Sequence, residues 1–185
     1  FIALPGVQSE VDLITRKVSS EVLLNQQFTS DSLKQTLSDT KTPVLHLATH
    51  GQFSSKIEDT FILTWDGKLN LSELEEVIGR RTETTSDPIE LLVLSACQTA
   101  KGDNRAVLGL AGLAVKSGAR STMATLWSVN DESTADFMAE FYKQLAKPNI
   151  AKSEALRQAQ LFLLKQPKYN HPFYWAPFVL VGNWL

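Results

Sequence analysis

The stretch Ile89-Glu-Leu-Leu-Val-Leu-Ser95 decides the fold of this chain. Its centre is a short, continuous apolar run, which is typical of a strand covered on both faces by helices. The run Pro43-Val-Leu-His-Leu-Ala48 has the same character, and further apolar strands are predicted over residues 120–126 and 178–181. Several buried strands separated along the chain indicate a mostly parallel sheet.

Helical segments are predicted between these strands. Val11, Ile14 and Val18 recur at helical spacing, and Ser30-Asp31-Ser32 can cap a second short helix that continues through Leu37. Further helices are predicted over residues 72–78, 107–116, 131–145 and 150–164. Strands that alternate with helices predict an α/β domain with helices on both faces of the sheet.

One hairpin interrupts this alternation. Residues 61–65 and 68–71 are predicted to be two antiparallel strands, and Asp66-Gly67 lies between them. Because Gly tolerates a positive φ, this pair predicts a two-residue turn.

Composition narrows the classes of function. The chain has 185 residues, a net charge of −2 and a single cysteine. The near-neutral charge, without a block of like charges, argues against a nucleic-acid or anionic-membrane partner. A lone cysteine forms no disulfide within the chain and suits a reducing compartment, so we expect a cytoplasmic protein. No apolar stretch is long enough to span a membrane.

The length predicts one globular domain over residues 1–185. The chain begins Phe-Ile-Ala-Leu-Pro, with no initiator methionine, so we expect it to be part of a longer protein.

Polar residues follow three of the predicted strands. They are Thr49-His50-Gly51, Ala96-Cys97-Gln98 and Ser128-Val-Asn-Asp131. The carboxyl ends of parallel strands meet at one edge of a sheet, where α/β proteins place their ligands. A thiol, an imidazole and a carboxylate are therefore predicted to share one crevice.

Each of these side chains also has a purely structural interpretation. Free cysteines usually pack as small apolar residues, although Cys97 follows its strand and precedes a polar run, which favours an exposed nucleophile. His50 precedes a glycine and is the best candidate base, whereas His46 within its strand and His171 beside a proline suit structural roles. Asp131 could cap the helix that follows it, or Asn130 could cap while Asp131 faces the crevice.

Other signatures of catalysis or cofactor binding are absent from the sequence. It contains no phosphate-binding loop, no GxGxxG dinucleotide motif, no GxSxG elbow and no HExxH zinc motif. We therefore expect neither a nucleotide cofactor nor a metal ion.

Four ordered motifs resemble the CHAT domain, a caspase-like branch of cysteine peptidases that is related to separases. They are His46-Leu-Ala-Thr-His-Gly51, Leu94-Ser-Ala-Cys-Gln-Thr99, Leu108-Gly-Leu-Ala-Gly112 and Leu126-Trp-Ser-Val-Asn-Asp131. His50 precedes Cys97 by 47 residues, close to the spacing of about 50 in caspases. The resemblance implies a three-layer α/β/α sandwich. CHAT domains are usually found in bacteria, where they follow tetratricopeptide repeats.

The resemblance also implies the site. Cys97 and His50 would form a catalytic dyad, and the backbone amides of Gly51 and Cys97 would form the oxyanion hole. Asp131, by its likeness to separases, would receive a basic P1 side chain, and Ser95 would contact the substrate. We therefore expect a cysteine endopeptidase acting on protein substrates. The alternative is a signalling module that keeps the fold but acts by binding, or that awaits activation by its repeat domain.

Overall fold

The computed structural model describes residues 4, 6–39, 41–54, 59–85, 88–95, 97–99 and 118–185. For residues 53, 71, 80–85 and 97–99 the description covers the backbone alone. The predicted helix over residues 107–116 lies outside the described residues.

A central sheet of mostly parallel strands organises the molecule. The sheet has the order β1-β5-β7-β8, with β1 (Val44–Leu47), β5 (Leu91–Leu94), β7 (Ser121–Thr125) and β8 (Phe178–Gly182). The first three strands are parallel and β8 is antiparallel to β7. All four predicted apolar strands are confirmed, with ends that differ by a residue or two.

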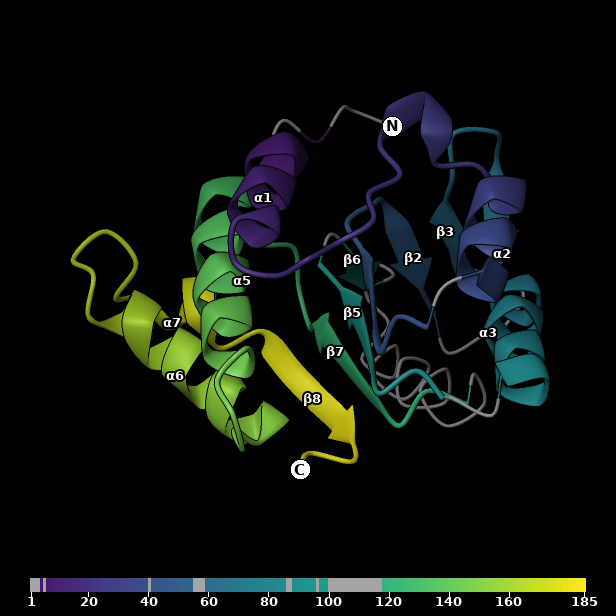
Figure 1. The fold of residues 1–185 in the computed structure, drawn as a ribbon. Coiled ribbons are helices and arrows are strands. Elements are labelled where there is room, and N and C mark those ends of the chain that lie inside the picture. Colours follow the sequence, from purple (N-terminus) through teal and green to yellow (C-terminus); the bar gives the residue numbers. More distant parts are fainter. Residues whose placement is uncertain are drawn as a thin grey trace.

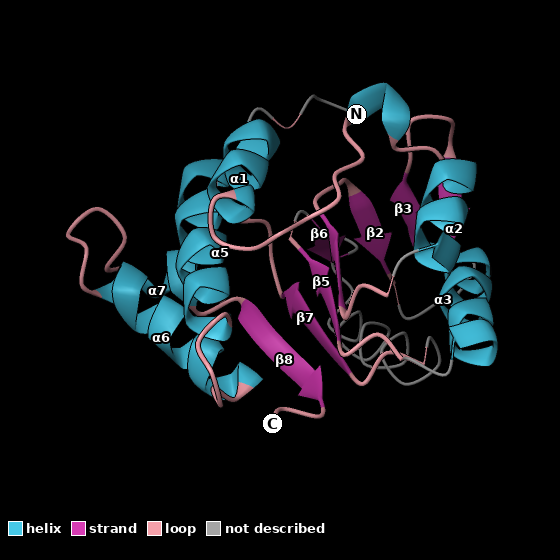
Figure 2. Ribbon diagram, in the orientation of Figure 1, coloured by secondary structure: helices cyan, strands magenta, loops and turns pink. Residues whose placement is uncertain are grey.

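Helices cover both faces of this sheet (Figures 1 and 2). One group comprises α1 (Gly6–Thr15), α5 (Asp131–Leu145), α6 (Lys152–Leu164) and α7 (Pro172–Trp175). The other comprises α2 (Ser30–Asp39) and α3 (Leu71–Thr85), with a 3₁₀ turn, η1 (Asn25–Gln27), ahead of α2. The three-layer α/β/α prediction is confirmed.

Strand β5 contributes to the core on both sides. Leu91 and Val93 pack with side chains of α5 and α6, whereas Leu92 and Leu94 pack with those of α2 and α3. Successive strand residues point to opposite faces, so four consecutive apolar residues are needed when both faces are covered. All four are buried.

A second sheet continues from the ends of two central strands. Its order is β4-β3-β2-β6, with β2 (Gly51–Phe53), β3 (Phe61–Leu63), β4 (Lys68–Asn70) and β6 (Cys97–Thr99). β2 follows β1, and β6 follows β5, so the pair that is parallel in the first sheet is parallel again in the second. Strands β2 and β6 were not predicted from the sequence.

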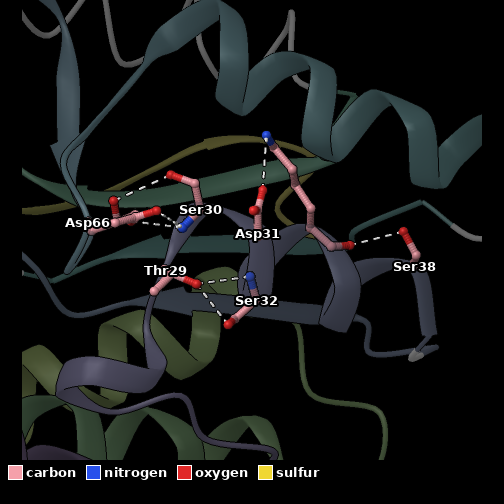
Figure 3. Close-up of polar contacts among 8 residues, drawn as sticks. Thr29, Ser30, Asp31, Ser32, Ser38 and Asp66 are labelled. Carbon is pink, nitrogen blue, oxygen red and sulfur yellow. Dashed lines mark hydrogen bonds and ion pairs between the residues drawn. The ribbon is translucent and has the colours of Figure 1, made fainter.

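The predicted hairpin is confirmed, but the prediction of a two-residue turn is wrong. Leu63 pairs with Lys68, so four residues connect β3 and β4, and Gly67 does not have a positive φ. Instead, Asp66 reaches the first turn of α2, where its carboxylate accepts the Ser30 N–H at 3.0 Å (Figure 3). Hydrogen bonds from Thr64 and from the Ser30 backbone lower the pKa of Asp66.

The cap of α2 and the length of α3 differ from prediction. Helix α2 begins at Ser30, and its cap is Thr29, whose hydroxyl accepts the Ser32 N–H at 3.1 Å (Figure 3), rather than a residue of Ser30-Asp31-Ser32. Helix α3 is longer than residues 72–78, and Asn70 and Glu73 exchange side-chain-to-backbone hydrogen bonds at its N-terminus. Within the described ranges, no helix has the length and apolar character needed to cross a membrane.

Candidate active site

The catalytic residues predicted from the sequence lie at the starts of neighbouring strands, because Cys97 begins β6 and His50 directly precedes β2. In the parallel pairing of β2 with β6, Gly51 is the direct partner of Cys97. His50 is the residue immediately before Gly51. Because paired strands lie about 4.8 Å apart, the backbones of His50 and Cys97 are close neighbours. The thiol of Cys97 lies outside the described part of the structure.

The β3 strand fixes the backbone around His50. The Leu63 N–H donates to the His50 carbonyl oxygen at 2.8 Å, and the Thr49 hydroxyl donates to the Leu63 carbonyl oxygen at 2.7 Å. These two bonds hold the segment between β1 and β2 from one side. The hairpin therefore helps to fix the backbone that carries His50.

A pocket opens at the carboxyl ends of the three parallel strands. His50, Ser95, Thr125, Ser128 and Asp131 line one part of it. The shared crevice is therefore confirmed for the imidazole and the carboxylate. Ser95 is 2% exposed, and its backbone N–H donates to the Leu47 carbonyl oxygen at 3.2 Å, which joins the ends of β5 and β1.

Helix α1 supplies the opposite part of the pocket. Gly6, Val7 and Glu10 line it, and α1 lies beside α5 (Figure 1). The Gly6 N–H donates to Asp131 Oδ2 at 3.3 Å. A Cβ atom at position 6 would come within 2.4 Å of the Asp131 Cβ, so glycine is required for this close approach.

Asn130, rather than Asp131, caps α5. The Asn130 side chain accepts the Ser133 N–H at 3.1 Å. The Asn130 carbonyl oxygen also accepts the hydroxyls of Ser133 and Thr134, at 2.9 and 3.0 Å. Asp131 is thereby left to face the pocket, so of the two arrangements that the sequence left open, the structure has the second.

His46 belongs to a buried polar group behind the pocket. Its Nδ1 lies 3.0 Å from the Tyr142 hydroxyl, and its Nε2 lies 3.1 Å from Glu10 Oε1. The second distance suits an ion pair. Burial, and then the charge of Glu10, raise the pKa of Tyr142, so its hydroxyl stays protonated. This group joins α1, β1 and α5.

We expect His46→Ala to reduce stability rather than chemistry. Its loss leaves the buried Glu10 carboxylate without its cationic or N–H partner, which should cost about 1–3 kcal/mol in free energy of unfolding. Urea unfolding of the wild type, His46→Ala, Glu10→Gln and the double variant measures this cost and its coupling to Glu10. A His46→Ala protein with unchanged stability but no activity would identify His46 as the base.

Glu10 is the pocket residue that sequence reasoning missed. It is 4% exposed, and it lies one helical turn before Ile14, which belongs to the core. The sequence signal that could have identified Glu10 is its spacing of four residues from Ile14, which places a carboxylate on the buried face of the helix. No cluster of three or more His, Cys, Asp and Glu side chains suited to a metal ion occurs within the described residues.

Comparisons with known proteins identify the family of the chain. A family model described as the CHAT domain matches residues 1–183. The human "Tetratricopeptide repeat protein 28" is 29% identical over 98 residues, which are 52% of this chain and 4% of that protein. Its mouse counterpart is 29% identical over 97 residues, 51% of this chain and 4% of the relative. The chain thus spans a small fraction of these relatives.

Proposed function

Because the chain belongs to the CHAT domain family, whose fold is caspase-like, we propose that it is a cysteine endopeptidase that cleaves proteins after a basic P1 residue. The observation that carries the proposal is the pairing of Gly51 with Cys97. This register brings a cysteine beside a glycine and its preceding histidine, at the mouth of a pocket that contains Asp131.

The reaction follows from the roles of these residues. The Cys97 thiolate attacks the scissile carbonyl carbon, and His50 takes up the thiol proton. The amides of Gly51 and Cys97 would donate to the developing oxyanion, because fixed backbone N–H groups stabilise that charge without rearrangement. His50 then gives its proton to the leaving amine as the C–N bond breaks, which leaves a thioester on Cys97.

Hydrolysis of the thioester completes the cycle. A water molecule loses a proton to His50 and attacks the thioester carbonyl, the C–S bond breaks, and the thiol is restored. Asp131 supplies the carboxylate that would attract the P1 cation into the pocket. The names of the relatives support a tetratricopeptide repeat domain as the neighbour of this domain in its parent protein.

Active-site labelling tests this proposal directly. The chain is incubated with two peptidyl chloromethyl ketones that differ only in P1, which is Arg in one and Asp in the other. We expect the Arg reagent to alkylate Cys97, as located by peptide mass spectrometry, and the Asp reagent to react much more slowly. Loss of labelling in His50→Ala would show that the imidazole activates the thiol.

The same experiment also tests the alternative that the domain is a signalling module. Binding of the peptide without alkylation of Cys97, together with no turnover of P1-Arg substrates, would indicate a domain that acts by recognition. Equal labelling by both reagents would instead support a reactive thiol and contradict the basic P1 preference.

A further inference from the structure

The pocket beside His50 is acidic. Its lining includes two carboxylates, Asp131 and Glu10, and none of its described lining residues is a lysine or arginine. Asp131 comes from the start of α5, whereas Glu10 comes from α1, so the two groups enter from different elements. A cation in this pocket would therefore meet negative charge from two directions.

Two buried side chains of the pocket, Ser95 and Glu10, offer acceptors to a ligand. Ser95 Oγ has no hydrogen-bond partner within the described part of the chain, and Ser95 is 2% exposed. Glu10 Oε1 lies 3.1 Å from His46 Nε2, and the lone pairs that this contact leaves on the carboxylate can accept further bonds. Buried polar atoms are normally paired, because an unpaired one loses its hydration without compensation. A ligand that donates hydrogen bonds into the pocket would satisfy the Ser95 hydroxyl and give the Glu10 carboxylate a second partner beside His46.

The size and acceptors of the pocket suit a guanidinium group. The pocket encloses about 50 Å³, room for roughly four water molecules, and a guanidinium has one carbon and three nitrogens. Its planar fork carries five N–H donors that can reach several acceptors at once. A lysine ammonium has three donors on a single atom and cannot span acceptors on separate elements equally well.

We propose that Glu10 and Ser95 complete a guanidinium subsite with Asp131, which makes the pocket selective for arginine over lysine. The inference rests on the proposed function for the use of this pocket as the P1 site. Asp131 provides attraction for either cation, and Glu10 and Ser95 discriminate between them. Glu10 and Ser95 are therefore specificity residues rather than catalytic ones.

Selectivity between matched substrates tests the proposal. The values of kcat/KM are measured on peptides that differ only in P1, as Arg or Lys, with the wild type, Glu10→Gln, Ser95→Ala and Glu140→Gln. Glu140 is a buried glutamate of α5 that does not line the pocket, so its variant is the matched control. We expect Glu10→Gln to reduce the Arg-to-Lys ratio about tenfold, Ser95→Ala to reduce it severalfold, and Glu140→Gln to leave it unchanged.

Ser95→Ala keeps the test decisive if Glu10→Gln fails to fold, because the Ser95 hydroxyl makes no hydrogen bond to any residue that the structure describes. Binding of n-butylguanidinium and n-butylammonium ions, measured by calorimetry on the same proteins, gives a second measurement that needs no turnover. The wild type should bind the guanidinium more tightly, and the pocket variants should lose that preference.

The outcomes separate this inference from the peptidase proposal. Cleavage after basic residues with the wild-type Arg-to-Lys ratio in both pocket variants would overturn the guanidinium subsite and leave the peptidase intact. Absence of cleavage, with a guanidinium preference that depends on Glu10 and Ser95, would uphold the subsite and overturn the peptidase.

Discussion

Replacing Cys97 with alanine should lower kcat/KM for a P1-Arg peptide by about 10⁴-fold or more, to the background of the assay. The variant retains the backbone of β6 but has no sulfur to form the thioester. His50→Ala should cause a loss of similar size, since the thiol then has no neighbouring base and the leaving amine no proton donor. Steady-state kinetics with a fluorogenic peptide measures both losses.

The double variant provides the internal control for the dyad. Residues that act as one unit give losses that do not add, so Cys97→Ala/His50→Ala should be scarcely slower than either single variant. Circular dichroism of each variant checks that the wild-type fold is kept. Wild-type turnover by Cys97→Ala would eliminate the mechanism.

Asp131→Asn should weaken cleavage after arginine and lysine by about 2–5 kcal/mol, or roughly 30-fold to several thousandfold in kcat/KM. The change removes the negative charge but keeps an oxygen that can accept the Gly6 N–H. The α5 cap belongs to Asn130, so helix stability should change little. The measurement compares peptides with Arg, Lys and Gln at P1.

Asp136→Asn is the matched control for this prediction. Asp136 lies on the same helix but pairs with Lys168 rather than lining the pocket. Burial raises the pKa of Asp136. We expect its variant to keep the wild-type preference. If Asp131→Asn also cleaved all three peptides as the wild type does, P1 recognition would belong to another residue.

Local patterns predicted the central sheet because burial on both faces demands continuous apolar runs. The apolar run Leu91–Leu94 is typical of a strand buried on both faces, and the alternation of strands with helices then implied a parallel sheet. The short strands β2 and β6 escaped prediction because Gln52 and Gln98 interrupt any apolar pattern there. Their pairing depends on register between segments far apart in the chain, which no local window contains.

The candidate site was predictable in its strand-end residues but not in its other wall. His50 and Asp131 follow predicted strands and Ser95 ends one, so topology alone placed them at one edge. Glu10 and Gly6 belong to a helix whose docking position is set by tertiary contacts. The turn at Asp66 shows the same limit, since its geometry is decided by the Ser30 N–H of another element.

The bond from the Gly6 N–H to Asp131 makes α1 docking and pocket occupancy linked equilibria. A ligand that contacts both Glu10 and Asp131 binds only when α1 is docked. Such a ligand therefore stabilises the docked position of α1 by the same free energy that its own binding loses when α1 undocks. Pocket ligands should therefore slow amide hydrogen exchange throughout α1, although they touch only part of that helix. Any force or partner that displaces α1 correspondingly weakens the ligand. The affinity for substrate and the stability of α1 docking therefore depend on the same coupling free energy.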